Sequence, residues 1–209
     1  MKKIGICILV FASFLSYAGN KKRTLDNPVF VFNNGLNQKQ YPVLSIDQQA
    51  DFVKKLGFDG MECKETDGLL ETVDAFQKKG MKIYANYVRI ELEAEYPYLP
   101  AWKEVMPKLK GTDMILWVHV HSNKYKPSDE ASDKILVPIV QELADLAKPY
   151  GIRIAIYHHV DFLVEKAEDP FRIAQKVDRE NVGSVFNLCH FLKTDSEENL
   201  EKVINMTLP

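Results

Sequence analysis

The chain has 209 residues, of which 46% are hydrophobic, 27% charged and 11% aromatic. This composition is that of a soluble globular protein, and it excludes a disordered, collagen-like or coiled-coil chain. With 27 Lys and Arg residues against 29 Asp and Glu residues, the formal net charge is -2. No basic field is therefore available to hold nucleic acid or an anionic membrane, and we expect a small-molecule partner.

The first 18 residues have the pattern of a secretory signal peptide. Two lysines precede an apolar run over residues 4–15, and small residues follow at positions 16 and 18, as signal peptidase requires. The run is shorter than the ~20 residues of a membrane-spanning helix. We expect an exported protein, periplasmic or secreted, with a signal peptide at 1–18, a linker at 19–27 and one domain at 28–209. A buried first strand or helix is the alternative interpretation.

From residue 28 onward, short β-rich apolar runs alternate with longer amphipathic stretches. This alternation predicts consecutive βα units around a parallel sheet. We predict strands at 29–33, 58–64, 82–88, 114–120, 153–157 and 182–187. We predict helices that begin near residues 45, 67, 102, 132, 169 and 195. The long connection over residues 89–100 is rich in aromatic and acidic residues, and such loops are often part of a site.

Polar residues at the predicted helix starts indicate how the helices begin. Ser45 and Gln48 have the spacing of a capping box, in which each side chain bonds the backbone of the other. Asp67 is expected to cap the second helix. Asp169 is expected to cap the fifth, with Pro170 at its first position.

All five histidines fall at the predicted carboxyl ends of strands. His119 and His121 end the fourth strand, His158 and His159 the fifth, and His190 follows the sixth. Ligands of parallel sheets bind at this edge, because the βα loops and the helix N-termini converge there. The concentration of imidazoles therefore predicts a functional site at the carboxyl edge.

The strand period of two sharpens the position of this site. It places His119 and His121 on one face, and it places Tyr157 on the same face as His159. The same period turns Glu62 toward the mouth of the sheet, and Asn187 lies near the end of the sixth strand. A carboxylate, several imidazoles, a phenol and an amide at one rim can carry out proton transfer on a hydroxylated substrate.

Structural interpretations compete with these functional ones. His119 and His121 could be a histidine pair satisfied by backbone and water, and Tyr157 a packed aromatic residue. His158 is expected to face a helix or solvent. Two cysteines, Cys63 and Cys189, remain after the signal peptide, and they form either a disulfide or two buried thiols. No dinucleotide, P-loop, zinc-protease or serine-hydrolase motif is present.

Residues 154–159 (Ile-Ala-Ile-Tyr-His-His), 186–190 (Phe-Asn-Leu-Cys-His) and 59–62 (Asp-Gly-Met-Glu) resemble the xylose-isomerase-like barrels. This group contains sugar phosphate isomerases and epimerases and endonuclease IV-type enzymes. The resemblance implies an α/β fold of the (β/α)8 TIM-barrel type. It also implies a divalent metal (Mn, Mg or Zn) held by Glu, Asp, His and Glu from the fifth to eighth strands, with the two glutamates moving a proton next to a carbonyl.

Tyr157 stands where the resemblance places the fifth-strand glutamate, and Asn187 stands where it places the sixth-strand aspartate. His190 matches a substrate-contacting histidine. A phenol and a neutral amide are weak ligands for hard divalent ions. His119, His121 and His159 are the remaining metal candidates, and the metal is left unknown.

These observations predict a sugar isomerase or epimerase that acts on a sugar or keto-sugar by acid/base proton transfer. Glu62, His159 and His190 are the expected catalytic groups. His119, His121, Tyr157 and Asn187 are the expected substrate contacts. Two alternatives stay open, a catalytically inactive carbohydrate-binding barrel and a lyase or hydratase acting on oxidised sugars. No nucleic acid and no membrane span are expected, and the oligomeric state is left open.

The chain contains about six predicted βα units, whereas a (β/α)8 barrel has eight and typically ~250 residues. We therefore expect the domain at 28–209 to be an incomplete barrel. Two further βα units would follow residue 209.

Overall fold

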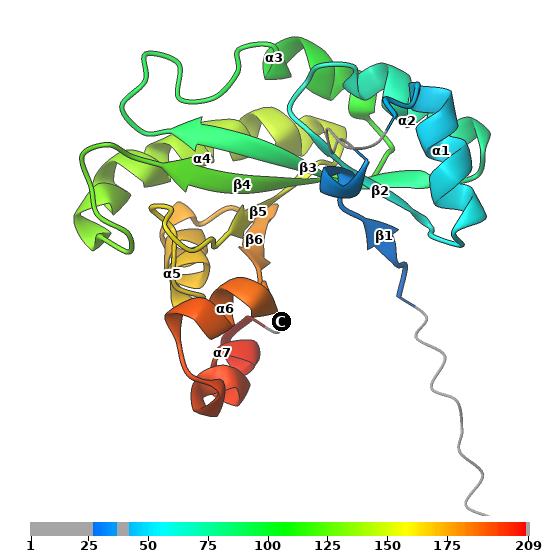
Figure 1. Ribbon diagram of the computed structural model, residues 1–209. Helices are drawn as coiled ribbons and strands as arrows, with labels where there is room; N and C mark the ends of the chain where they lie inside the picture. Colours follow the sequence, from blue (N-terminus) through cyan, green and yellow to red (C-terminus); the bar gives the residue numbers. More distant parts are fainter. Residues whose placement is uncertain (1–26, 37–41, 208–209) are drawn as a thin grey trace, which may run out of the picture.

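Six parallel strands form one sheet, with helices along its outer side. The computed structural model describes residues 27–36 and 42–207, and the expected signal peptide at 1–18 and most of the linker lie outside these residues. Within them the strands follow one another in sequence order, with β1 and β6 at the edges (Figure 1). The strands are β1 (Phe30–Val31), β2 (Gly60–Lys64), β3 (Lys82–Glu91), β4 (Ile115–His121), β5 (Arg153–Tyr157) and β6 (Val182–Val185). This is the α/β arrangement expected of a TIM-barrel type fold.

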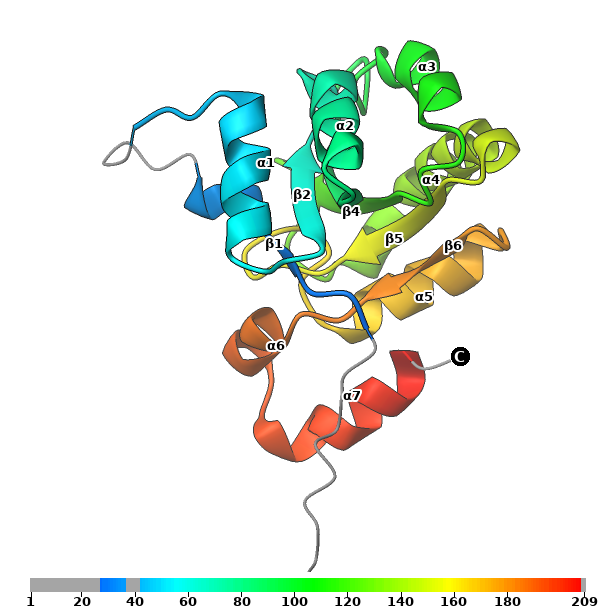
Figure 2. The same ribbon diagram turned by 90° about the vertical axis from the view of Figure 1, so that its right-hand side faces the viewer.

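The helices cover the outer face of the curved sheet, as the turned view in Figure 2 shows for α1 to α5. They are α1 (Ile46–Lys55), α2 (Leu69–Lys78), α3 (Trp102–Val105), α4 (Asp133–Ala147), α5 (Glu168–Val177), α6 (Leu188–Thr194) and α7 (Leu200–Thr207). No helix among the described residues has the length and apolar character needed to cross a membrane. Both cysteines of the described residues are free, and because Cys63 is buried whereas Cys189 is exposed, the expectation of a disulfide or of two buried thiols is wrong.

The outer face of the sheet carries the hydrophobic core. Val118 and Val120 on β4 and Ile156 on β5 are fully buried, in one cluster with Leu136 and Leu143 of α4. Burying each such side chain contributes roughly 1.5–3 kcal/mol. The predicted alternation is confirmed, because His119, between the two valines, and Tyr157, next to Ile156, contact the aromatic rings of the inner face.

Aromatic rings from four strands pack together on the inner face. Phe30 stacks on Tyr84 with ring centroids 5.1 Å apart, and Trp117 lies 5.8 Å from Phe30 and 6.0 Å from Tyr157. Offset and tilted contacts at these separations are favourable for aromatic pairs. They link β1, β3, β4 and β5 on the inner face of the sheet.

Several predicted element ends are confirmed and others are wrong. The capping box of α1 is present, because Gln48 N–H donates to Ser45 Oγ and Ser45 N–H donates to the Gln48 side chain. Asp67 does not cap α2. The cap position is Gly68, whose φ of 62° is a left-handed conformation that glycine adopts readily;.

Asp169 does not cap α5 either, since the cap is Ala167 and the helix begins at Glu168. The buried Asp169 carboxylate instead accepts the backbone N–H groups of Glu165 and Lys166, in the loop before the helix. It also accepts the Arg172 guanidinium at 2.9 Å. The Asp169 side chain therefore holds the β5–α5 loop in place through these hydrogen bonds.

The C-terminal part differs most from the prediction. The sixth strand ends at Val185, and a helix that was not predicted, α6, begins directly after Asn187. The last helix begins at Leu200 and not at Asp195. The Asp195 carboxylate accepts from Ser196 N–H and Asn199 Nδ2 in the turn that precedes α7.

Gly60 is required where β2 pairs with β3. A Cβ at this position would overlap the Lys82 carbonyl oxygen and approach the Tyr84 ring. Because a backbone oxygen in a sheet cannot move aside, Gly60→Ala is expected to lower the free energy of unfolding by about 3 kcal/mol, measured in urea. A Cβ at Gly183 meets nothing within 4 Å. Gly183→Ala is therefore the control, expected to change stability by less than ~0.5 kcal/mol, and equal losses at the two sites would contradict this account.

Candidate active site

A cavity of about 190 Å³ lies at the carboxyl edge of the sheet, where the sequence predicted a site. Four predicted residues line it, namely Glu62, Tyr157, His159 and His190. Its other lining residues are Phe32, Asn34, Lys64, Tyr87 and Phe162. The cavity therefore collects side chains from β2, β3 and β5, from the segments that follow β1 and β5, and from α6.

Glu62 is the carboxylate of this cavity, and it is fully buried. The Asn33 N–H donates to its Oε2 at 2.9 Å, while its Oε1 has no hydrogen-bond partner among the described residues. Burial raises the pKa of Glu62, and the Asn33 hydrogen bond and the Lys64 charge oppose this shift;. One carboxylate oxygen is thus anchored, and the other is buried without a hydrogen-bond partner in the described part of the chain.

Tyr157, Asn187 and His190 form a hydrogen-bonded series beside Glu62. The Asn187 Nδ2 donates to the Tyr157 hydroxyl oxygen at 2.5 Å. The His190 backbone N–H donates to Asn187 Oδ1 at 3.2 Å, so Asn187 also caps α6. Tyr157 is 5% exposed, and burial raises the pKa of its hydroxyl. The phenol is therefore protonated at neutral pH.

Four aromatic rings contact one another in series at the cavity, and all of them except His121 line it. The ring centroids are 3.8 Å apart for His190 and His159, 3.9 Å for His159 and Phe162, and 4.0 Å for Phe162 and His121. Sequence reasoning missed Phe162, because it lies in a loop without periodicity. An aromatic residue three positions after the histidine pair at 158–159, namely Phe162, was the available signal.

The hydrogen bonds of the two lining histidines give them complementary roles. His159 Nδ1 lies 2.6 Å from the Val160 carbonyl oxygen, which can only accept, so Nδ1 carries a proton and Nε2 has the lone pair of the neutral ring;. The Val160 N–H donates to His190 Nδ1 at 3.4 Å, so His190 carries its proton on Nε2. Burial first, and then the charges of His159 and His158, lower the pKa of His190 to about 4.

His119 and His121 lie next to the cavity, but they are not among its lining residues. Their Nδ1 and Nε2 atoms are 2.8 Å apart and share a hydrogen bond, and the His119 ring stacks 3.9 Å from Tyr87. Burial and the neighbouring His121 lower the pKa of His119 to about 3. The pKa of His121 is also lowered, by burial and then by Arg89. The pair is therefore uncharged at neutral pH.

His158 is not among the cavity residues and faces the start of α6, which confirms the first of its two predicted surroundings, a helix or solvent. It is fully buried, its Nε2 accepts the Asn187 N–H at 2.9 Å, and its Nδ1 lies 3.3 Å from the Glu165 carbonyl oxygen. Burial lowers its pKa. His158 therefore fixes the loop that carries the site and does not take part in it.

The described residues do not fit the metal site that the resemblance implied. Tyr157 and Asn187 are bonded to each other, and the His119 and His121 nitrogens are joined by their own hydrogen bond. Within residues 27–36 and 42–207, no group of three His, Cys, Asp or Glu side chains could hold a metal ion.

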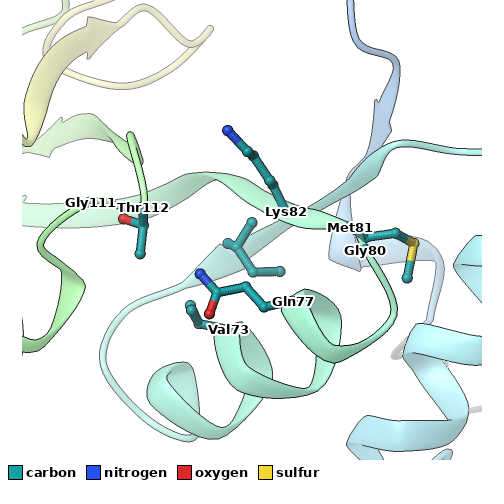
Figure 3. Close-up of a pocket in the computed structure, with 8 residues that line it drawn as sticks. Val73, Gln77, Gly80, Met81, Lys82, Gly111 and Thr112 are labelled. Atoms are coloured by element: carbon teal, nitrogen blue, oxygen red, sulfur yellow. The ribbon is translucent and has the colours of Figure 1, made fainter.

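A second cavity, of about 270 Å³, lies at the opposite edge of the sheet (Figure 3). Val73 and Gln77 of α2 face the start of β3 there, and Thr112 lies on its other side. Lys82 is the first residue of β3, so this cavity lies at the amino edge of the sheet, away from the histidines. The Lys82 ammonium group forms an ion pair with Asp113 at 3.5 Å. This cavity has no carboxylate or imidazole in its lining. The cavity at the carboxyl edge is the candidate active site.

A parallel βα sheet with a polar cavity at its carboxyl edge defines a TIM-barrel type protein with its site in the usual place. The model of the family described as "Xylose isomerase-like TIM barrel" matches residues 50–207. The chain therefore belongs to the xylose isomerase-like TIM barrel family.

Individual relatives agree with this assignment. The inosose isomerase of Bacillus licheniformis is 38% identical over 69 residues, which are 32% of this chain and 25% of that protein. The match thus spans a quarter of that relative's length. A D-psicose 3-epimerase structure determined with D-fructose has a TM-score of 0.67 at 16% identity, over 88% of this chain and 70% of that one. The IOLI protein with a bound zinc atom has a TM-score of 0.67 at 21% identity, over 87% and 70%. At these identities the structural matches establish the fold.

Proposed function

We propose that the protein is a sugar isomerase or epimerase that moves a proton at the carbon next to the carbonyl group of a keto-sugar. The observation that carries the proposal is the buried Oε1 of Glu62, which has no hydrogen-bond partner among the described residues, in a cavity that also presents His159 and His190. The names of relatives, an inosose isomerase and a D-psicose 3-epimerase, support the same class of substrate.

Glu62 is the proposed base. Its carboxylate takes the proton from the carbon next to the carbonyl, the C–H electron pair forms a C=C bond, and the carbonyl π pair moves to oxygen. Glu62 returning its proton to the neighbouring carbon gives an isomer, whereas an epimer forms when a donor on the opposite face, such as a water molecule, protonates the original carbon and Glu62 releases its proton to solvent. A base works best when its pKa lies near the operating pH. Burial raises the pKa of Glu62 in that direction.

His159 and His190 are the proposed partners for the substrate oxygens. The His190 Nε2–H donates and the His159 Nε2 accepts, so that one hydroxyl proton can be moved between neighbouring oxygens as the double bond shifts. The lowered pKa of His190 keeps the ring neutral at pH 7. The Asp169 contacts and the Leu163 N–H bond to Val120 hold the β5–α5 loop in place, which fixes the geometry before a ligand arrives;.

Product analysis on a substrate panel tests this proposal. D-fructose, D-psicose and an inosose are incubated with the protein, and products are separated by chromatography. We expect interconversion of at least one ketone with an isomer or epimer, reduced ~10²–10⁴-fold by His190→Ala or His159→Ala. Gln77→Ala, in the cavity of Figure 3, is the control and is expected to retain turnover.

The same experiment separates the two alternatives. If the substrate loses water and forms an unsaturated ketone, detected by its ultraviolet absorbance, the protein is a lyase and not an isomerase. Saturable sugar binding without any product would replace it by a carbohydrate-binding barrel.

We propose further that the protein acts outside the cytoplasm. This rests on the signal-peptide pattern of residues 1–18 alone. N-terminal sequencing of the protein from a secreting host is expected to begin near residue 19. An intact Met1 would contradict export.

A further inference from the structure

The Tyr157 hydroxyl has one hydrogen-bond partner among the described residues, and the direction of that bond is fixed. Asn187 Oδ1 is occupied by the His190 backbone N–H, at 3.2 Å, because Asn187 caps α6. Its Nδ2 must therefore face Tyr157, and an amide nitrogen can only donate. The 2.5 Å bond from Asn187 Nδ2 uses a lone pair of the phenol oxygen. The phenol proton itself is left without an acceptor within the described chain.

This free proton belongs to a buried group at the cavity. Tyr157 is 5% exposed, it lines the cavity, and the only carboxylate among the lining residues is Glu62. The charge of Glu62 is close enough to contribute to the raised pKa of Tyr157, so the carboxylate and the hydroxyl lie near each other in the same cavity. A buried hydroxyl without an acceptor costs free energy unless a ligand oxygen takes the bond.

We propose that Tyr157 is a further catalytic residue, whose Oη–H donates to the carbonyl oxygen of a polyhydroxy ketone and stabilises that oxygen as it becomes an enolate. Asn187 is the positioning residue that keeps the phenol proton aimed at the ligand. The inference rests on the proposed function. As Glu62 removes the proton, the carbonyl π pair moves to the oxygen that Tyr157 bonds, and the hydrogen bond strengthens with the growing charge. When the proton returns to carbon, the carbonyl reforms, and Tyr157 keeps its proton throughout.

Two substitutions test the donor and its aim separately. Tyr157→Phe removes the hydroxyl and keeps the ring that packs on Trp117. Asn187→Asp retains a good helix cap, but its carboxylate can only accept, so it draws the phenol proton away from the ligand. Tyr84→Phe is the matched control, because Tyr84 lies on the same inner face and is not among the cavity residues.

The first readout is the rate of deuterium exchange next to the carbonyl of the ketones in the panel. We expect Tyr157→Phe and Asn187→Asp each to lower kcat ~10²–10³-fold, with KM changed by less than about threefold, and Tyr84→Phe to match the wild-type protein. Loss of kcat in Asn187→Asp at unchanged thermal unfolding separates the aiming role from a merely structural one. Unchanged kcat in Tyr157→Phe would overturn the inference and leave the proposed function standing.

The second readout does not need turnover. Glycolohydroxamate, a planar anionic mimic of an enediolate, is titrated into each protein by calorimetry. We expect affinity to fall at least about tenfold in Tyr157→Phe and in Asn187→Asp, but not in Tyr84→Phe. If no ketone is exchanged by the wild-type protein, the proposed function fails, while this titration still tests the donor. Equal affinity of the wild-type protein and Tyr157→Phe, or no binding by the wild-type protein, would overturn the inference.

Discussion

Glu62→Gln is expected to abolish proton transfer while stabilising the protein at neutral pH. The amide cannot take a proton from carbon, so we expect turnover to fall by at least about 10³-fold. The Asn33 N–H bond can be kept by the amide oxygen, because it uses only one of the two carboxylate oxygens. Removing a buried charge that lacks a full set of partners is expected to raise the free energy of unfolding by about 1 kcal/mol.

The sign of the stability effect depends on pH. The pKa of Glu62 is raised in the folded protein, so the folded state holds this proton more tightly than the unfolded state does. Glu62 therefore favours the folded state below the pKa that it has in the unfolded chain. This stabilising contribution is lost as pH rises through its pKa in the folded protein. We expect Glu62→Gln to be more stable than the wild-type protein at pH 8 and equal to it near pH 4, in urea titrations.

Glu65→Gln is the matched control for this variant. Glu65 also has a raised pKa caused by burial, but it bonds Arg89 N–H and the Trp102 indole, and it is not among the cavity residues. We expect its turnover to stay within about threefold of the wild-type value. An active Glu62→Gln, or an equally inactive Glu65→Gln, would remove Glu62 as the base.

Mild acid is expected to destabilise the protein between pH 6.5 and 5, before most carboxylates titrate. Four histidines have lowered pKa values because they are buried, namely His119, His121, His158 and His190. A group whose folded pKa is depressed binds its proton mainly in the unfolded state, so stability falls as pH falls below the unfolded value of about 6.5. Protonation of Glu62 offsets part of this loss.

The size of the acid effect follows from linkage. The pKa of His119 is about 3 in the folded protein, so at pH 5 the unfolded chain binds a proton at His119 and the folded protein does not. This difference lowers the free energy of unfolding by roughly 2 kcal/mol at pH 5 relative to pH 8. The other three histidines add to this loss, which is large against the ~5–15 kcal/mol of a typical domain. Urea titrations at pH 8, 6.5 and 5 measure it. Between pH 8 and pH 5, the free energy of unfolding of His119→Gln is expected to fall by about 2 kcal/mol less than that of the wild-type protein. A wild-type protein that is equally stable at pH 8 and pH 5 would contradict the assignment of buried neutral imidazoles.

The sequence predicted the site where strand periodicity holds. The bounds of β5 agree with the prediction, and the alternation of Val118 and Val120 with the histidines turned His119 and His121 inward as expected. Glu62 was placed by the same rule. These residues lie on regular parallel strands, in which the side-chain direction depends only on counting by two.

Residues outside regular strands could not be placed in this way. The pairing of β2 with β3 skips Tyr84, so Tyr84 and Tyr87 both face inward, although a strict period of two would separate them. Asn187 was expected near the end of a strand and instead starts α6, since its side chain caps the helix. Phe162 stacks on His159 within the β5–α5 loop and packs at a tilt against His121 at the end of β4, and no local pattern encodes the contact between this loop and β4.

Deuterium exchange by the wild-type protein and by Glu62→Gln, followed side by side by proton NMR, tests the central claim most directly. The samples contain D-fructose, D-psicose or an inosose in D2O, and the signal of the hydrogen next to the carbonyl is recorded over time. The account predicts that the wild-type protein accelerates the loss of this signal for at least one ketone and that Glu62→Gln leaves it at the uncatalysed rate. Exchange by Glu62→Gln at the wild-type rate would contradict it.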